Sequence, residues 1–206
     1  MILLVSGNTV QVRRASAHVG ILHVPSGGHD PSSCQGRVWA ADNGAFSGFD
    51  EPAFVRMLRR LREGMVSGVV PRPLFVAAPD AVGDASETSR LFSRWEPLLH
   101  ADGWPVALVA QDGLRAADIP WSSLEAVFIG GTTGYKLGRD AAVIAETARA
   151  SGKWVHMGRV NTVRRMRRAH AIGCGSVDGS SFSRWPSTLL FADAACAELS
   201  RTGRLF

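Results

Sequence analysis

Short apolar runs recur along the whole chain, and they constrain its fold more than any other feature. Amphipathic helical patterns lie between the later runs, for example at 51–64 and 84–103. Continuous apolar strands that alternate with amphipathic helices are typical of a parallel sheet covered by helices. Eight runs are candidate strands: 2–5, 19–24, 37–41, 73–78, 105–110, 126–130, 153–157 and 175–177.

Eight strands within 206 residues favour an α/β fold, a small (β/α)8 barrel of the TIM type, formed as a single domain over residues 1–206. This length lies near the short limit of about 200 residues for the fold. The segment between the first two strands carries no clear helical pattern. An open, doubly wound parallel sheet is therefore the alternative architecture.

Two helix starts are marked by side chains that can cap them. Asp50 precedes the helical pattern at 51–64, and Asp84 is followed three residues later by Glu87, which is the spacing of a capping box. Further helices are expected at 139–152, 161–173 and 187–203, each of which ends on a glycine.

Composition excludes several classes of protein. No apolar run approaches the ~20 residues that span a bilayer, so we expect a soluble, cytoplasmic protein without a membrane partner. Cys34, Cys174 and Cys196 are widely spaced and form no Cys-x-x-Cys pair, and no His-x-His pattern accompanies them. We therefore expect no disulfide framework, no metal site and no cofactor.

The charge balance suits a polyanionic partner. The net charge is +5, and of 23 basic residues only Lys136 and Lys153 are lysines. Because arginine binds phosphate through paired hydrogen bonds, the excess favours a nucleic acid; a biased base composition of the gene is the alternative explanation. The oligomeric state stays open.

Polar or glycine-rich clusters follow six of the candidate strands, at 41–46, 78–84, 110–113, 130–134, 156–159 and 177–181. The C-terminal ends of parallel strands meet at one face, where active sites are built in such folds. Turn formation explains each cluster singly, and helix capping explains Asp84. Together, however, they predict a pocket in which carboxylates act as acid, base or nucleophile: Asp42, Asp80, Asp84, Asp112 and Asp178.

Other residues at these strand ends suit a planar ligand. Gly130 and Gly131 allow the backbone to approach a flat ring closely. Phe46 and Met157 are suited to contact its two faces, although Met157 taken alone is more often a core residue. His156 lies inside an apolar strand and is expected to be a core histidine.

Four motifs within residues 38–182 resemble, in the same order, those of the tRNA-guanine transglycosylases, also called queuine tRNA-ribosyltransferases. "ADNGAF" resembles their Asp-Ser-Gly-Gly-aromatic motif, and "VAQDG" their Val-Gln-Gly-Gly strand end. "FIGGTTGYKLG" resembles their Gly-Gly-Leu-x-x-Gly loop, and the stretch from "VHMGR" to "SVDG" their Met-Gly-x-Gly segment, which leads through a helix to a strand-end aspartate. The short chain looks most like the phage-type relatives that put 7-deazaguanine bases into DNA.

The resemblance implies a pentosyltransferase that replaces guanine in a nucleic acid by a 7-deazaguanine base through a covalent Asp–sugar intermediate. It implies Asp178 as the nucleophile and Asp42 as the second catalytic carboxylate. The family's cysteine and histidine zinc site is absent from this sequence, which favours DNA over tRNA as the partner. The residues implied to bind the base are Phe46, Gln111, Gly130, Gly131, Met157, Gly158 and one of Asp80 and Asp84, between which the sequence does not decide.

The arginine-rich helix at 161–173 lies between two of these motifs. Arg164, Arg167 and Arg168 share one helix face, from which Arg165 diverges, and Arg159 precedes the helix. We expect Arg159 and the three residues of this face to bind the nucleic-acid backbone and so to place the sugar next to Asp178. A solvated outer face of a barrel helix is the alternative.

Two other classes of function remain open at this stage. One is a barrel enzyme that acts on small molecules, either hydrolysing nucleosides or sugars or cleaving sugars as an aldolase does. The other is a nucleic-acid-binding protein without catalytic activity, which would use only the arginines.

Overall fold

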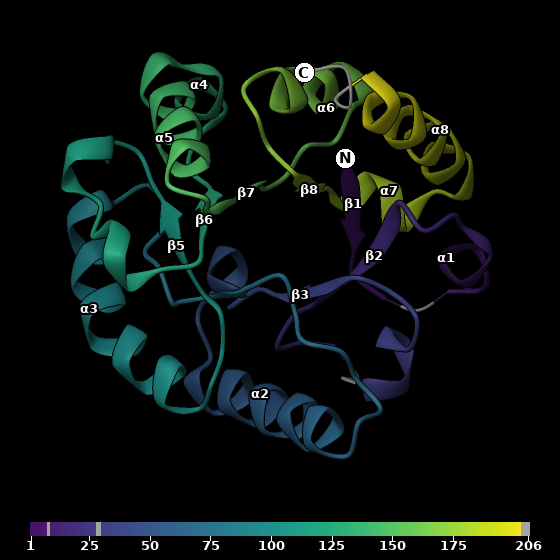
Figure 1. Cartoon of the computed structure of the whole chain (residues 1–206), viewed down its shortest axis with the longest axis horizontal. Helices are drawn as coiled ribbons and strands as arrows, with labels where there is room; N and C mark the ends of the chain where they lie inside the picture. Colours follow the sequence, from purple (N-terminus) through teal and green to yellow (C-terminus); the bar gives the residue numbers. More distant parts are fainter. Residues whose placement is uncertain (8, 28–29, 203–206) are drawn as a thin grey trace.

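The computed structural model describes residues 1–7, 9–27 and 30–202. Its strands form one closed parallel barrel in sequence order, seen in Figure 1 inside a ring of helices. Pairing of Leu3 with Val177 joins the first strand to the last and closes the barrel. The barrel expectation is confirmed and the open sheet is wrong. The strands are β1 (Ile2–Val5), β2 (Val19–His23), β3 (Trp39–Ala41), β4 (Val76–Ala77), β5 (Val106–Ala110), β6 (Ala126–Ile129), β7 (Trp154–Met157) and β8 (Ser176–Asp178).

The helical ring around the barrel is uneven. The chain passes from β2 to β3 through one short 3-10 helix, η1 (Pro31–Cys34), and from β5 to β6 through two, η3 (Ala116–Asp118) and η4 (Trp121–Ser123). These short connections explain how a barrel fits a chain of this length. The remaining helices are α1 (Val10–Arg14), η2 (Ala45–Ser47), α2 (Glu51–Val66), α3 (Ala85–Ala101), α4 (Thr133–Leu137), α5 (Arg139–Ala150), α6 (Val163–Ala171), α7 (Ser180–Arg184) and α8 (Pro186–Thr202).

Side chains cap the N-termini of α2 and α6, at Asp50 as the sequence predicts and at Thr162, which the sequence analysis did not single out. The Asp50 carboxylate accepts a hydrogen bond from Ala53 N at 2.9 Å, and the Thr162 hydroxyl accepts one from Arg165 N at 3.2 Å. Each cap satisfies an N–H group that has no partner inside its helix. Helices α1, α4 and α7 span five residues each, too few to show a helical period in the sequence. No helix in the described ranges is both long and apolar enough to cross a membrane.

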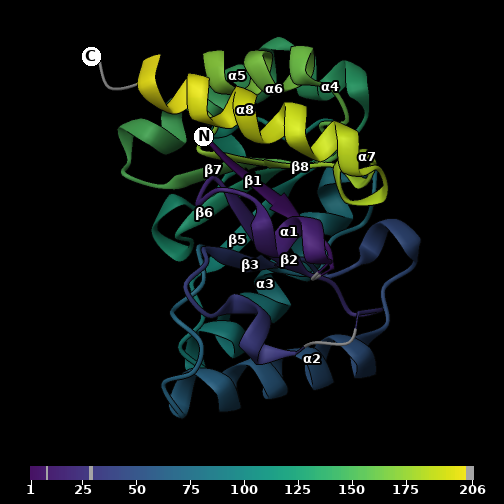
Figure 2. The same ribbon diagram turned by 90° about the vertical axis from the view of Figure 1, so that its right-hand side faces the viewer.

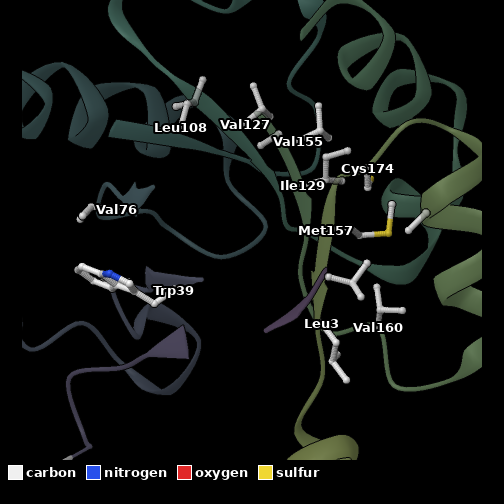
Figure 3. Close-up of a cluster of buried hydrophobic side chains, with 14 of the residues drawn as sticks. Leu3, Trp39, Val76, Leu108, Val127, Ile129, Val155, Met157, Val160 and Cys174 are labelled. Carbon is white, nitrogen blue, oxygen red and sulfur yellow. The ribbon is translucent and has the colours of Figure 1, made fainter. Parts of the chain in front are cut away.

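Apolar side chains fill two layers, because successive residues of a strand face opposite sides of the barrel wall. Leu4, Phe75, Val109 and Phe128 belong to a smaller cluster inside the barrel. Their neighbours along the strands pack outward against the helices in a larger cluster, part of which Figure 3 shows. The inner cluster forms the floor on which the cavity at the strand ends rests, since Val109 and Phe128 also line that cavity.

Seen from the side, the helices cover the barrel along its length (Figure 2). The C-terminal ends of the strands open on one face, and the chain returns through a helix or turn to the opposite face before each new strand. Residues that directly follow a strand therefore gather around a single opening.

Candidate active site

A cavity of about 420 Å³ opens at the C-terminal ends of the strands. This volume is within the range of small-molecule sites in proteins. The sequence-predicted residues that line it are Asp42, Phe46, Asp80, Gln111, Gly130, Gly131, Gly158, Arg159 and Asp178. These residues come from the ends of β3 to β8, so the structure brings together nearly all the strand-end clusters.

Asp42 and Asp178, the two residues predicted to be catalytic, are among the carboxylates that line this cavity. Asp42 follows β3, and its Oδ1 accepts a hydrogen bond from Gly44 N at 3.1 Å. Burial first, and the negative charge of Asp178 second, raise the pKa of Asp42 to about 7. Near neutral pH, Asp42 therefore exists in both its protonated and its ionised form, as a group that gives and takes protons must.

Asp178 ends β8 and is anchored through one of its oxygens. Its Oδ1 accepts hydrogen bonds from His156 Nε2 at 3.1 Å and from Arg159 N at 3.0 Å. Gly158 makes this arrangement possible, because a Cβ there would overlap the Phe128 ring and lie 3.3 Å from Asp178 Oδ1. Gly158 is thus required for close packing beneath the carboxylate.

Asp80 lies at the centre of a buried hydrogen-bond network. Its Oδ1 accepts from Asn43 Nδ2 at 2.8 Å, and its Oδ2 accepts from Gln111 Nε2 at 2.6 Å. Asn43 also donates to Ala78 O at 2.7 Å, and Gln111 Oε1 accepts from Gly83 N at 2.9 Å. Burial raises the pKa of Asp80. The network holds a carboxylate and an amide side by side at the cavity wall.

Asp84, the alternative to Asp80 in the sequence analysis, lies outside the cavity. Its carboxylate accepts from Glu87 N at 3.0 Å and caps α3, in an exposed position outside the cavity lining. The capping box is only half formed, because the Glu87 carboxylate binds Arg90 instead of reaching back. Of the two residues between which the sequence does not decide, Asp80 lines the cavity and Asp84 does not.

The predicted contact of Met157 with a planar ligand is also wrong. Met157 is the last residue of β7, and its side chain points outward into the apolar cluster with Ile129 and Cys174 (Figure 3). Its neighbour His156 faces inward instead, where its ring contacts Phe128. Because side chains alternate along a strand, a residue next to an inward-facing one cannot also reach the cavity.

Arg159 occupies the position across from Phe46. Its guanidinium lies 3.6 Å from the centre of the Phe46 ring. The Phe46 side chain is 61% exposed and stands at the mouth of the cavity. The backbone of Arg159 has a φ of 57°, in the left-handed region that residues other than glycine rarely adopt. In this conformation the backbone N–H of Arg159 points toward Asp178. Functional sites are where such backbone strain concentrates.

The loop after β6 offers backbone groups to the cavity. Gly131 has φ of 75°, and a Cβ there would lie 2.5 Å from Asp112 Oδ2, so only glycine fits. Asp112 accepts from Thr132 N at 2.8 Å and from Thr132 Oγ1 at 2.6 Å. Asp112 therefore braces this loop and does not line the cavity, contrary to its expected place among the pocket carboxylates.

The arginines of α6 lie outside the cavity. Arg164, Arg167 and Arg168 are exposed, whereas Arg165 is half-buried, in agreement with the predicted helix face. Arg167 pairs with Glu198 of α8 at 3.3 Å, so part of its charge is already balanced. The exposed face agrees with a contact to nucleic acid and equally with a solvated helix.

Some cavity residues escaped the sequence analysis. Lys136 on α4 donates from Nζ to Gly158 O at 3.0 Å, and burial lowers its pKa. Arg184 at the end of α7 lines the rim, and Asn43 braces Asp80. Two sequence features could have pointed to these residues: Lys136 is one of only two lysines, and Asn43 directly follows Asp42.

Metal ligands do not converge in the described ranges, where no three side chains of histidine, cysteine, aspartate or glutamate are close enough to hold an ion.

Comparison with known proteins establishes the fold. No family model matches the sequence, and no curated protein matches it. The BexX/CysO complex of Amycolatopsis orientalis is similar at 15% identity and a TM-score of 0.58, over 98% of this chain and 88% of that one. Phosphoribosyl anthranilate isomerase from Thermus thermophilus is similar at 14% identity and a TM-score of 0.49, over 97% of this chain and 100% of that one. At 15% identity, the first of these likenesses is one of fold alone.

Proposed function

We propose that this protein is a nucleic-acid base-exchange enzyme, a pentosyltransferase that replaces guanine by a 7-deazaguanine base, with DNA as its polymer substrate. The observation that carries the proposal is the pair Asp42 and Asp178 in one cavity, where the pKa of Asp42 is raised to about 7. Two carboxylates with different environments serve as nucleophile and as proton shuttle in glycosidic chemistry.

The reaction divides into two displacements at C1′ of the sugar. Asp178 attacks C1′ while the bond to N9 of guanine breaks, and protonated Asp42 gives its proton to the departing base. The incoming base then loses its N9 proton to Asp42 and attacks C1′, which releases Asp178. Each displacement inverts the sugar carbon, so the exchanged nucleoside keeps its original configuration.

The polar edge of the base would face the Asp80 network. The Asp80 carboxylate retains lone pairs that suit the N1–H and the exocyclic amine of guanine. Gln111 and the N–H of Gly131 would supply neutral hydrogen-bond donors for a carbonyl of the base. Guanine and 7-deazaguanine bases share this edge, so one site would accept both.

Cationic side chains support a polyanionic substrate. Lys136, Arg159 and Arg184 line the cavity beside Asp178, and Arg164 and Arg168 are exposed on the neighbouring α6. Phosphate contacts of this kind position a strand without reading its sequence. In a duplex the target nucleotide would have to leave the base stack, at a cost of a few kcal/mol.

The test is transfer of a labelled 7-deazaguanine base into DNA, with tRNA in a parallel reaction. Asp178→Asn should abolish transfer and leave the fold intact. Asp84→Asn is the matched control, since it removes one carboxylate outside the cavity and leaves a residue that caps α3 equally well. Transfer by Asp178→Asn at the wild-type rate would refute the role of Asp178, and transfer into tRNA alone would refute DNA as the substrate.

A second candidate function rests on Lys136, whose buried amine lies in the same cavity. An amine with a lowered pKa can form an imine with the carbonyl of a small sugar. Borohydride reduction in the presence of a pentose phosphate would trap such an imine as a stable mass increase. Lys136→Met should abolish the increase and Lys153→Met should keep it, whereas no increase in the wild type would exclude this candidate.

A further inference from the structure

A chain of hydrogen bonds runs inside the barrel, between β7 and β8, to the candidate nucleophile. Trp154 Nε1 donates to Ser176 Oγ at 2.8 Å, and Ser176 Oγ lies 2.9 Å from His156 Nδ1. His156 Nε2 lies 3.1 Å from Asp178 Oδ1. The four residues alternate between β7 and β8, and the pairing of His156 with Ser176 in the sheet holds them in register.

Both histidine nitrogens are committed within this chain. His156 and Ser176 are 0% exposed. The imidazole packs against two rings, 5.1 Å from the centre of Phe75 and 4.5 Å from that of Phe128. A buried imidazole can bond only to the partners that surround it, and losing one of them leaves an unsatisfied polar atom. The position of His156 is therefore fixed by packing and by hydrogen bonds at both nitrogens.

The chemistry of the groups sets the direction of the chain. The indole N–H is only a donor, so the Ser176 oxygen accepts from Trp154 and its own proton is available for His156 Nδ1. An ionised carboxylate is only an acceptor, so the proton of His156 resides on Nε2 and is donated to Asp178. The direction thus runs from Trp154 through Ser176 and His156 to Asp178, with one proton donated at each step.

We propose that His156 is a positioning residue that holds Asp178 for attack on the sugar, an inference that rests on the proposed base-exchange function. Together with Arg159 N, His156 Nε2 binds Asp178 Oδ1. Oδ1 is thereby held by these two donors, and Oδ2 is the oxygen that forms the bond to C1′. His156 itself does not touch the substrate and transfers no proton in the reaction.

Two amide variants of His156 separate its contact with Asp178 from its contact with Ser176. In His156→Gln the amide nitrogen reaches about as far as Nε2 and can still donate to Asp178. In His156→Asn the shorter amide reaches only as far as Nδ1, so it can contact Ser176 but leaves Asp178 with Arg159 N alone. Both variants place an amide in the same buried site, which makes each the control for the other.

The measurements are the rate of covalent enzyme–DNA adduct formation, the Kd for the free base, and the thermal midpoint of unfolding. We expect His156→Asn to slow adduct formation by about 100-fold, since a misplacement of about 1 Å can cost that much. The Kd for the base should stay unchanged, because the Asp80 network is intact. His156→Gln should recover most of the rate. Equal rates for wild type and both variants, or equal losses in both, would overturn the positioning role.

A second measurement does not depend on activity. Nitrogen chemical shifts of the wild-type protein labelled at histidine should show His156 as the Nε2–H tautomer at neutral pH, and Asp178→Asn should alter the Nε2 shift. The Nδ1–H tautomer would overturn the proposed direction even if the His156 variants are unstable. If the wild type transfers no base and forms no adduct, the proposed function fails together with the role of His156. If the wild type is active and only the His156 results disagree, the function stands and this inference alone fails.

Discussion

Replacing Asp42 by Asn should stabilise the protein at neutral and alkaline pH and have little effect in acid. The pKa of this carboxyl is raised from an ordinary value near 3.8 to about 7 in the folded protein, chiefly by burial and next by the charge of Asp178. The folded state therefore holds the proton more tightly than the unfolded chain. The stability contributed by this proton is complete below about pH 4 and is lost as the pH rises through about 7.

The magnitude follows from the size of the pKa difference. Each pKa unit corresponds to about 1.4 kcal/mol, so the full penalty above neutral pH is up to about 4 kcal/mol. Asn has nearly the same shape, keeps an oxygen for the Gly44 N–H and cannot ionise. The free energy of unfolding of Asp42→Asn relative to wild type should thus rise steadily between about pH 4 and 7 and then level off.

Urea unfolding at a series of pH values measures this difference directly. Asp84→Asn, which removes a negative charge from an exposed helix cap, is the control for net charge. Asp178→Asn should move the pH-dependent region downward, because it removes a charge that raises the pKa of Asp42. If wild type and Asp42→Asn lose stability in parallel across the whole range, the buried carboxylate pair does not exist as described.

Three further predictions concern binding. Phe46→Ala should weaken binding of the free base by about 1–3 kcal/mol, the usual value of one stacked base; calorimetry showing no change would place the base away from the cavity mouth. Asp80→Asn should weaken base binding, whereas Asp84→Ala should leave base binding unchanged. Asp84→Ala should instead lower the free energy of unfolding by about 1 kcal/mol, because the cap of α3 is lost. Weaker base binding in Asp84→Ala and unchanged binding in Asp80→Asn would show that Asp84 contacts the base. Replacing Arg164 and Arg168 together by Ala should reduce the magnitude of the negative slope of log affinity against log salt by about two for duplex DNA, since each phosphate contact releases roughly 0.9 counterion. A slope that is the same for wild type and for the double variant, with DNA and with tRNA alike, would show that this face of α6 is solvated.

The strands were predictable because their apolar runs are continuous and each must be buried on both sides of the barrel wall. All eight observed strands overlap the expected runs, and β1 matches its run end for end. The caps at Asp50 and Asp84 were predictable because they depend on residues close in sequence. The five-residue helices α1, α4 and α7 were not, since their stability comes from the barrel that they contact.

The sequence alone determined which strand ends would meet around one opening, because parallel strands in a closed barrel all end on the same face. It did not determine which side chains would enter that opening. A shift of one residue along β7 separates His156, which faces the barrel interior, from Met157, which faces the helices. Four residues along one loop likewise separate Asp80 at the cavity from Asp84 on the helix cap. The network of Asn43, Asp80 and Gln111, and the contact of His156 with Asp178, join residues from different strands. Only the closed barrel brings these groups within hydrogen-bond distance. A local sequence pattern does not predict which residue of a neighbouring strand a side chain will contact.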